Sequence, residues 1–189
     1  MQRPHSPLWI GGSGERVALR LVAQYGVAAN ISGSPDVIRH KLEVLRRPCE
    51  AVGRSNDEII RSTNVTVHLL QPGEDAERAT ATWREHHSLE VYRQGCVLGT
   101  VDQVVEALQA RVDAGINYLI VYLQGIAYDR SLVEQLAREV VPHLQPRDPK
   151  TTRMGMGIHV PKRRGLPWRR RAATSNPRER RESSLYLSL

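Results

Sequence analysis

The chain has 189 residues, of which 40% are hydrophobic and 25% charged, with a net charge of +7, and this profile indicates one folded domain with or without a tail. No apolar run approaches the ~18 residues that cross a bilayer, and the N-terminus lacks the apolar core of a signal peptide, so we expect a cytoplasmic protein without a membrane span. Two cysteines, Cys49 and Cys96, are too few for a disulfide framework or a four-ligand zinc site.

The first predicted elements are a short strand and a helix. The strand at 8–10 is apolar and is closed by a glycine-rich turn. The helix that follows is predicted by four apolar residues with near-helical spacing: Val17, Leu21, Val22 and Tyr25. Gly26 follows the last of these residues and predicts the end of the helix.

Strands and helices continue to alternate through residue 145. Further strands are predicted at 27–31, 65–70 and 118–123. Helical segments are predicted at 37–52, 57–60, 74–92, 100–115 and 129–141. Pro48 should kink the first of these helices or end its regular part early. Four strands, each followed by helical sequence, predict right-handed crossovers, a parallel sheet and an α/β fold.

One turn, IGGSGER at 10–16, has residues of the kind that bind phosphate. Glycines let backbone N–H groups approach an anion closely, and the N-terminus of the next helix adds partial positive charge. Arg16 suits an anion, whereas Glu15 would weaken anion binding if it pointed inward. The dinucleotide fingerprint fails at Val17, and no Gly-Lys-Ser/Thr triplet is present. The alternative is a tight turn that only packs a helix against a sheet.

No catalytic residue or metal site is predicted from the remaining sequence. His86 and His87 are adjacent, and together with His68 and Cys96 they contain ligand types that bind metals. The side chains of a doublet diverge on a helix, however, so we interpret the two histidines as exposed to solvent.

Residues 4–16, PHSPLWIGGSGER, together with LRLVA at 19–23, resemble the second half of luciferase-like monooxygenases. Within that superfamily they are most similar to the actinobacterial group that uses the deazaflavin coenzyme F-420. The resemblance covers roughly residues 3–144 and continues at 30–31, 41–47, 49–54, 99–104 and 113–121. One departure lies at 25–28, where relatives usually carry an acidic residue and this chain has none.

The resemblance implies a partial (β/α)8 TIM barrel that consists of the last four βα units of a luciferase-like barrel. It implies an oxidoreductase or monooxygenase that uses reduced coenzyme F-420 or FMN, with an organic substrate that the sequence does not identify. In such proteins the glycine turn contacts the cofactor phosphate through backbone amides. That role falls here on four residues: Gly11, Gly12, Ser13 and Gly14.

A complete barrel takes ~250 residues, whereas the expected domain here is 1–145. The inner face of the strands would then present apolar side chains to water, which predicts poor stability, self-association or assembly with a separately encoded first half. We expect the chain alone to be inactive. The alternative from another class is a non-catalytic flavin-binding or interaction module.

Residues 146–189 differ from the rest of the chain in charge and pattern. They contain 12 Lys or Arg and 3 Asp or Glu, a net charge of +9, whereas residues 1–145 have a net charge of −2. Because no periodic apolar pattern continues there, we predict a disordered Arg-rich tail. The tail is either an extension without function or a segment that binds nucleic acid or anionic lipid without sequence specificity.

Overall fold

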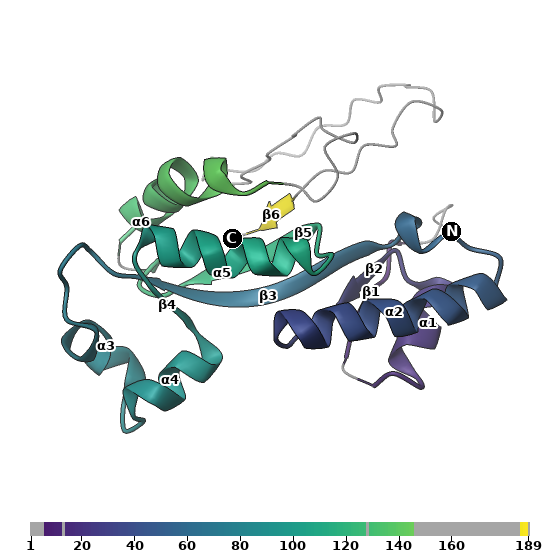
Figure 1. Cartoon of the computed structure of the whole chain (residues 1–189), viewed down its shortest axis with the longest axis horizontal. Coiled ribbons are helices and arrows are strands. Elements are labelled where there is room, and N and C mark those ends of the chain that lie inside the picture. The colour runs from purple at the N-terminus through teal and green to yellow at the C-terminus, as the bar shows by residue number, and fades with distance from the viewer. Residues whose placement is uncertain (1–5, 13, 128, 146–185, 189) are drawn as a thin grey trace, which may run out of the picture.

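Parallel pairing joins the six strands of the described part of the chain into one sheet (Figure 1). The computed structural model describes residues 6–12, 14–127, 129–145 and 186–188. The strands are β1 (Trp9–Gly11), β2 (Ala28–Asn30), β3 (Ile60–Leu69), β4 (Val97–Gly99), β5 (Tyr118–Leu123) and β6 (Tyr186–Ser188). Their order is β1-β2-β3-β5-β6, and β4 pairs with the C-terminal part of β3.

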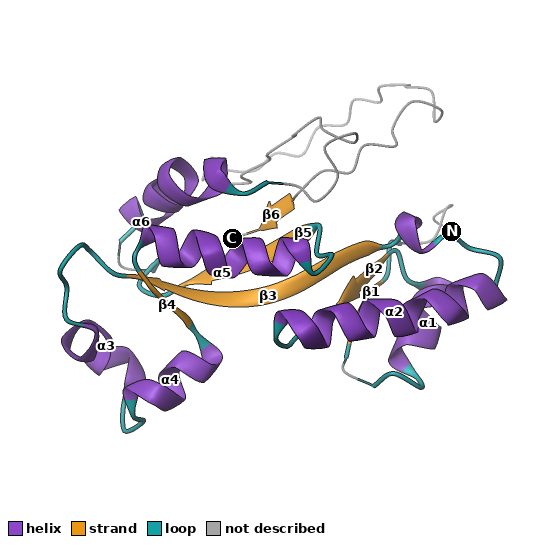
Figure 2. Cartoon of the chain, viewed as in Figure 1, coloured by secondary structure: helices purple, strands orange, loops and turns teal. Residues whose placement is uncertain are grey.

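Helical segments connect successive strands, as Figure 2 shows. They are α1 (Ala18–Tyr25), α2 (Pro35–Ala51), the short turn η1 (Asn56–Glu58), α3 (Ala76–Arg84), α4 (Leu89–Gly95), α5 (Val101–Asp113) and α6 (Ser131–Gln135). A π-helical stretch η2 (Leu136–Val140) and a 3-10 turn η3 (Val141–His143) continue α6. The predicted α/β class with a parallel sheet is confirmed. Within the described residues, every helix is too short or too polar to cross a bilayer.

Helices α1, α2 and α5, together with η2, cover one face of the sheet. On β5 the residues Leu119, Val121 and Leu123 are buried, and they share this face with Val65 and Val67 of β3. The helices contribute the other half of this core through fully or almost fully buried side chains: Ile38 and Leu45 of α2, Val104 and Leu108 of α5, and Leu136 and Val140 of η2. Alternation along β5 therefore places every second residue against the helices.

The opposite face of the sheet, which we call the open face, is partly exposed among the described residues, although Ser62 and His68 on it are buried. Trp9 is 44% exposed and Tyr122 55% exposed, and Asn64 also lies on this face and is exposed. The Trp9 ring meets the Tyr118 ring edge to face at a centroid distance of 4.9 Å, although β2 and β3 lie between their strands. Because neighbouring strands are ~4.8 Å apart, this contact requires the sheet to curve toward the open face. The face combines aromatic rings with amides and is not uniformly apolar.

The C-terminal end of α1 is fixed by an arginine from a distant segment. Arg54, which follows α2, donates from Nη1 to the backbone oxygen of Gly26 at 2.6 Å, and at 3.3 and 3.4 Å to those of Ala23 and Val22. The last carbonyl groups of a helix have no partner within the helix, and a guanidinium satisfies several of them at once. The helix end thus has a cationic cap that comes from outside the helix.

Several predicted element boundaries were wrong. The helix α2 does not end early at Pro48 but continues to Ala51, because the proline removes only one internal hydrogen bond; a kink at Pro48 stays a prediction. The single helix predicted at 74–92 is two helices, separated at Glu85, which has a φ of 51°. Strand β3 begins at Ile60, five residues before the predicted start. Strand β4 was not predicted, and its three residues are too few to form an alternating pattern.

The predicted disordered tail lies outside the described residues except for 186–188. These three residues form β6, which pairs in parallel with Tyr118–Ile120 of β5. The prediction of a tail without structure was therefore wrong for this short segment. The domain boundary at 145 stays a prediction.

Candidate functional site

The predicted phosphate-binding turn connects the C-terminal end of β1 to α1. Gly12 has a φ of 146°, and a Cβ atom there would lie 3.3 Å from the Cβ atom of Ala18, the first residue of α1. Gly12 is thus the position where the turn requires glycine. A Cβ atom at Gly11 would make only an ordinary contact with Asn30 at 3.8 Å, and one at Gly14 would meet nothing within 4 Å. Ser13 lies outside the described residues.

The N-terminus of α1 has no side-chain cap. Val17 occupies the cap position and provides no hydrogen-bonding side chain, and the first turn contains no acidic residue. The Ala18 amide donates to the Gly14 carbonyl at 3.0 Å, which fixes the turn against the helix. Amides at a helix N-terminus without such a cap are free to bind an anion, and the helix dipole favours negative charge there.

Glu15, the one carboxylate in the turn, is held by another helix. Its Oε1 atom lies 3.1 Å from Nε2 of His40 on α2. Arg16 and Arg20 are exposed next to it. The carboxylate that would weaken anion binding therefore has a partner on α2, and the neighbouring charges are positive.

An amide pair lies on the open face next to the turn. Asn30 is the residue of β2 that pairs with Gly11, and its Nδ2 atom donates to Oδ1 of Asn64 on β3 at 2.9 Å. The sequence analysis did not single out Asn64. Strand register would have identified it, because positions 62, 64 and 66 of β3 alternate with positions 63, 65 and 67, which are buried against the helices.

A second polar group, at the C-terminal ends of β3 and β5, consists of a histidine, a tyrosine and a cysteine. His68 Nδ1 lies 3.1 Å from the hydroxyl of Tyr92, which also interacts with Cys96 and Gln124. Burial lowers the pKa of His68, raises that of the Cys96 thiol and raises that of Tyr92 to about 12. All three groups are uncharged at neutral pH, so this network offers no charged ligand. The contact between His68 and Tyr92 attaches α4 to the sheet.

The predicted ligand types for a metal are not brought together. His86 and His87 are exposed on the segment between α3 and α4. Within the described residues no group of three or more His, Cys, Asp or Glu could hold a metal ion.

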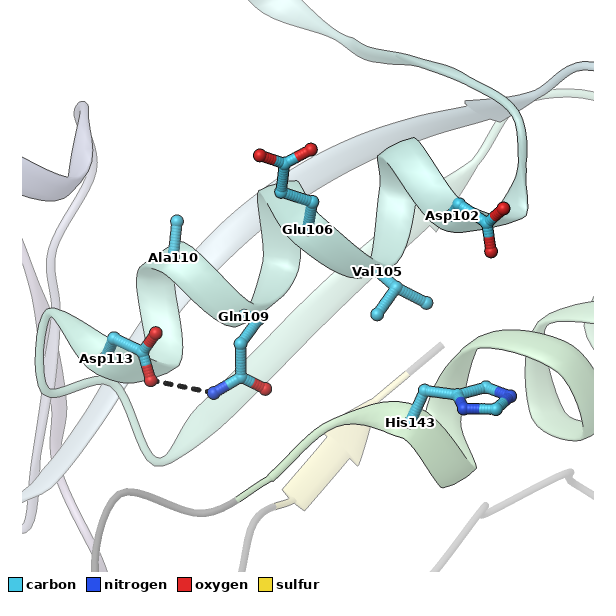
Figure 3. Close-up of a pocket in the computed structure, with 7 residues that line it drawn as sticks. All are labelled: Asp102, Val105, Glu106, Gln109, Ala110, Asp113 and His143. Carbon is cyan, nitrogen blue, oxygen red and sulfur yellow. Dashed lines mark hydrogen bonds between the residues drawn. The ribbon is translucent and has the colours of Figure 1, made fainter.

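A groove of about 490 Å³ lies on the helical side, between α5 and His143 (Figure 3). Carboxylates of Asp102, Glu106 and Asp113 line it, which makes it unsuitable for an anionic ligand. Gln109 of α5 crosses it and donates to Oδ1 of Asp113 at 2.7 Å and to the backbone oxygen of Gln145 at 2.9 Å. The groove therefore contains none of the predicted site residues, and Gln109 fixes the backbone at Gln145.

Comparison with known proteins identifies the fold. No protein-family model and no curated protein sequence matches the chain. Among solved structures it is similar to an F-420-dependent secondary alcohol dehydrogenase in complex with an F-420–acetone adduct. The two chains are 13% identical with a TM-score of 0.61, and the match covers 76% of this chain and 50% of the dehydrogenase. It is similar to the coenzyme F-420-dependent tetrahydromethanopterin reductase of Methanopyrus kandleri, at 17% identity, a TM-score of 0.55, and coverage of 74% and 51%.

A flavin monooxygenase has the same fold. The oxygenating constituent of 3,6-diketocamphane monooxygenase from Pseudomonas putida, in complex with FMN, matches at 16% identity and a TM-score of 0.54, over 74% of this chain and 49% of that chain. The chain thus spans about half the length of these three structures. Its described part shares a parallel α/β fold with part of each of these three enzymes.

Proposed function

We propose that the chain is part of an oxidoreductase of the luciferase-like type and holds the phosphate of a flavin or deazaflavin in the turn after β1. In this proposal β1, β2, β3 and β5 are the last four strands of a (β/α)8 barrel, and β4 is an addition to β3. The observation that carries the proposal is the α1 N-terminus, which has no side-chain cap behind a turn that requires glycine at Gly12.

The residues of the turn have separate roles in this function. Backbone amides at Gly11–Gly14 and in the first turn of α1 bind the phosphate, except the Ala18 amide, which donates to Gly14. His40 keeps the Glu15 carboxylate occupied. Asn30 and Asn64, next to Gly11 on the open face, supply amide donors and acceptors to the adjoining hydroxyl-bearing part of the cofactor. The cofactor, when bound, supplies the hydride or the oxygen activation, and the protein orients it and excludes water.

The test is a titration of the purified chain with coenzyme F-420 and with FMN, followed by absorbance and fluorescence. Gly12→Val should abolish binding, since the side chain would strain the backbone and displace Ala18. Gly95→Ala is the matched control, because a Cβ atom there meets nothing within 4 Å. Equal affinity of the two variants for both cofactors would contradict the proposal.

Deletion of residues 146–189 separates this function from binding by the basic tail. If the shortened chain still binds the cofactor, the site at the turn is supported. If binding is lost, residues 146–189 are needed for it and the turn alone is not the site.

A second candidate is a cofactor-binding module without turnover. It is favoured by the coverage of about half of each matched structure, because the other half of each structure has no counterpart in the alignment. Oxidation of the reduced cofactor by the purified chain, measured with candidate carbonyl acceptors or oxygen, distinguishes the two: a binding module shows affinity without oxidation above the rate of free cofactor.

A further inference from the structure

An apolar surface surrounds the proposed site on the side away from α2. We define the α1–β1 flank as Leu8, Val17, Leu21 and Tyr25. Their exposed fractions are 46%, 66%, 41% and 59%. Three of them are spaced by four residues along α1 and form one stripe, while Leu19, Val22 and Ala23 bury the other side of the helix. Of the four apolar residues that predict this helix, only Val22 is buried.

The flank lies at an end of the sheet. Strand β1 is the last strand in the order, and within the described residues its outer edge pairs with no strand (Figure 1). An edge strand with free backbone groups, next to exposed apolar side chains, is a surface that accepts another chain.

The opposite end of the sheet already accepts a parallel strand. β6 pairs with the outer edge of β5 through Tyr118, Leu119 and Ile120, and β5 continues to Leu123 beyond this pairing. The edge of β5 is therefore able to bind a strand that runs in the direction of β1.

We propose that the α1–β1 flank docks on the β5 edge of a second copy of this chain, so that two copies close one barrel. The proposal rests on the proposed function, because the turn at Gly12 borders this flank. A two-fold axis along the barrel would place β1 of each copy beside β5 of the other and keep all strands parallel. The matched structures, about twice as long as their aligned region, contain a second half of comparable length.

The charges on α1 and on the helix after β5 have opposite signs, which favours a second copy of this chain as the partner. Exposed Arg16 and Arg20 accompany the stripe on α1. The helix that follows β5 has exposed Glu134 and Glu139, with Arg138 as the opposing charge. In the closed dimer α1 of one copy is next to this acidic helix of the other, and opposite charges meet.

The first test is the molar mass of the chain in solution, measured by light scattering after size exclusion and by sedimentation between 1 and about 100 µM. We expect a dimer, and expect Leu21→Asp with Tyr25→Asp to weaken association at least about tenfold. Val91→Asp is the matched control, since Val91 is 48% exposed on α4, outside the flank. A folded wild-type monomer at the highest concentration overturns the proposal, as does equal weakening by the control.

The second test addresses the orientation of the two copies. Arg20→Glu should weaken the dimer, and adding Glu134→Arg and Glu139→Arg should restore it, because the charges are then exchanged between the two flanks. A chain that ends at Leu185 lacks β6, which competes for the β5 edge, and should associate more tightly. Failure of both changes, with normal circular dichroism, overturns docking at the β5 edge.

Cofactor titration of the same variants separates this proposal from the proposed function. A monomeric chain that binds the cofactor refutes the dimer alone. A dimer that binds neither coenzyme F-420 nor FMN refutes the phosphate site alone.

Discussion

The two ends of the sheet differ in how completely the chain covers them. At the β3–β5 end, Leu119 and Leu108 have no exposed surface, and even the polar side chain of His68 is only 9% exposed and bonded. At the β1 end, a helix N-terminus has no side-chain cap, and a stripe of apolar residues faces solvent. Burial at the covered end therefore stabilises the domain, whereas the β1 end leaves apolar side chains in contact with solvent.

The largest expected effect is at the covered end. Leu119→Ala leaves a cavity under α5 and should lower the free energy of unfolding by about 2–5 kcal/mol. Leu21→Ala, on the exposed stripe, should cost the monomer less than about 1 kcal/mol. Urea unfolding at low protein concentration measures both. Similar losses would show that the stripe is as well packed as the core and would remove the contrast.

Arg54→Ala sharpens the comparison at the end of α1. Loss of the cap on three backbone carbonyls should cost about 1.5–3 kcal/mol and increase hydrogen exchange of α1 amides. Arg46→Ala is the control, because Arg46 and Glu43 form an exposed pair at 3.2 Å that contributes about 0–1 kcal/mol. Unchanged exchange in α1 would mean that the cap does not stabilise the helix.

Trp9→Ala should have a smaller effect, since the ring is 44% exposed and has one edge-to-face contact with Tyr118. An aromatic pair of this kind contributes about 0.5–1.5 kcal/mol. Thermal unfolding of Trp9→Ala, Tyr118→Ala and the double variant isolates the pair interaction. Strict additivity of the three values would show that the two rings do not stabilise each other, and that the sheet curves without them.

The smallest effect concerns acidification at the covered end. Burial lowers the pKa of His68 below 6.5, and Glu74 opposes the shift. The unfolded chain therefore binds a proton more readily, so the stability from this residue is present above pH 6.5 and is lost as the pH falls through the folded pKa. His68→Gln should lose less stability than the wild type between pH 7.5 and 5. An equal loss in both proteins would assign the pH dependence to other groups.

Much of the fold follows from the order of apolar runs and glycines. The predicted strands lie within one residue of those observed at 9–11, 28–30 and 118–123. Local sequence also accounts for the start of α5, where the Thr100 backbone N–H donates to Oε1 of Gln103 at 3.0 Å. The early part of β3 was missed because Arg61, Ser62 and Asn64 are polar. Their bonding comes from distant residues, as in the 3.1 Å bond from the Ser62 hydroxyl to the Ala29 carbonyl.

The candidate site was only partly predictable. The glycine turn has a local signal, but the partner of Glu15 is 25 positions away on α2, and the partner of Asn30 is 34 positions away on β3. Spacing along α1 predicts a helix and not which side of it is buried, because Val17, Leu21 and Tyr25 satisfy the same period as a buried stripe. Packing against α2 determines which side of α1 is buried, and this packing exists only in the folded domain.

The two hydrogen bonds between the Gln109 side chain and the Gln145 backbone require glutamine at position 109. Its amide oxygen accepts from the Gln145 backbone N–H at 2.8 Å, and its nitrogen donates to the Gln145 carbonyl at 2.9 Å. The side chain thus imitates a neighbouring peptide unit, with a donor and an acceptor side by side. Glutamate keeps only the acceptor, leucine keeps neither, and asparagine is one methylene shorter, so no other standard side chain reproduces both bonds from this distance.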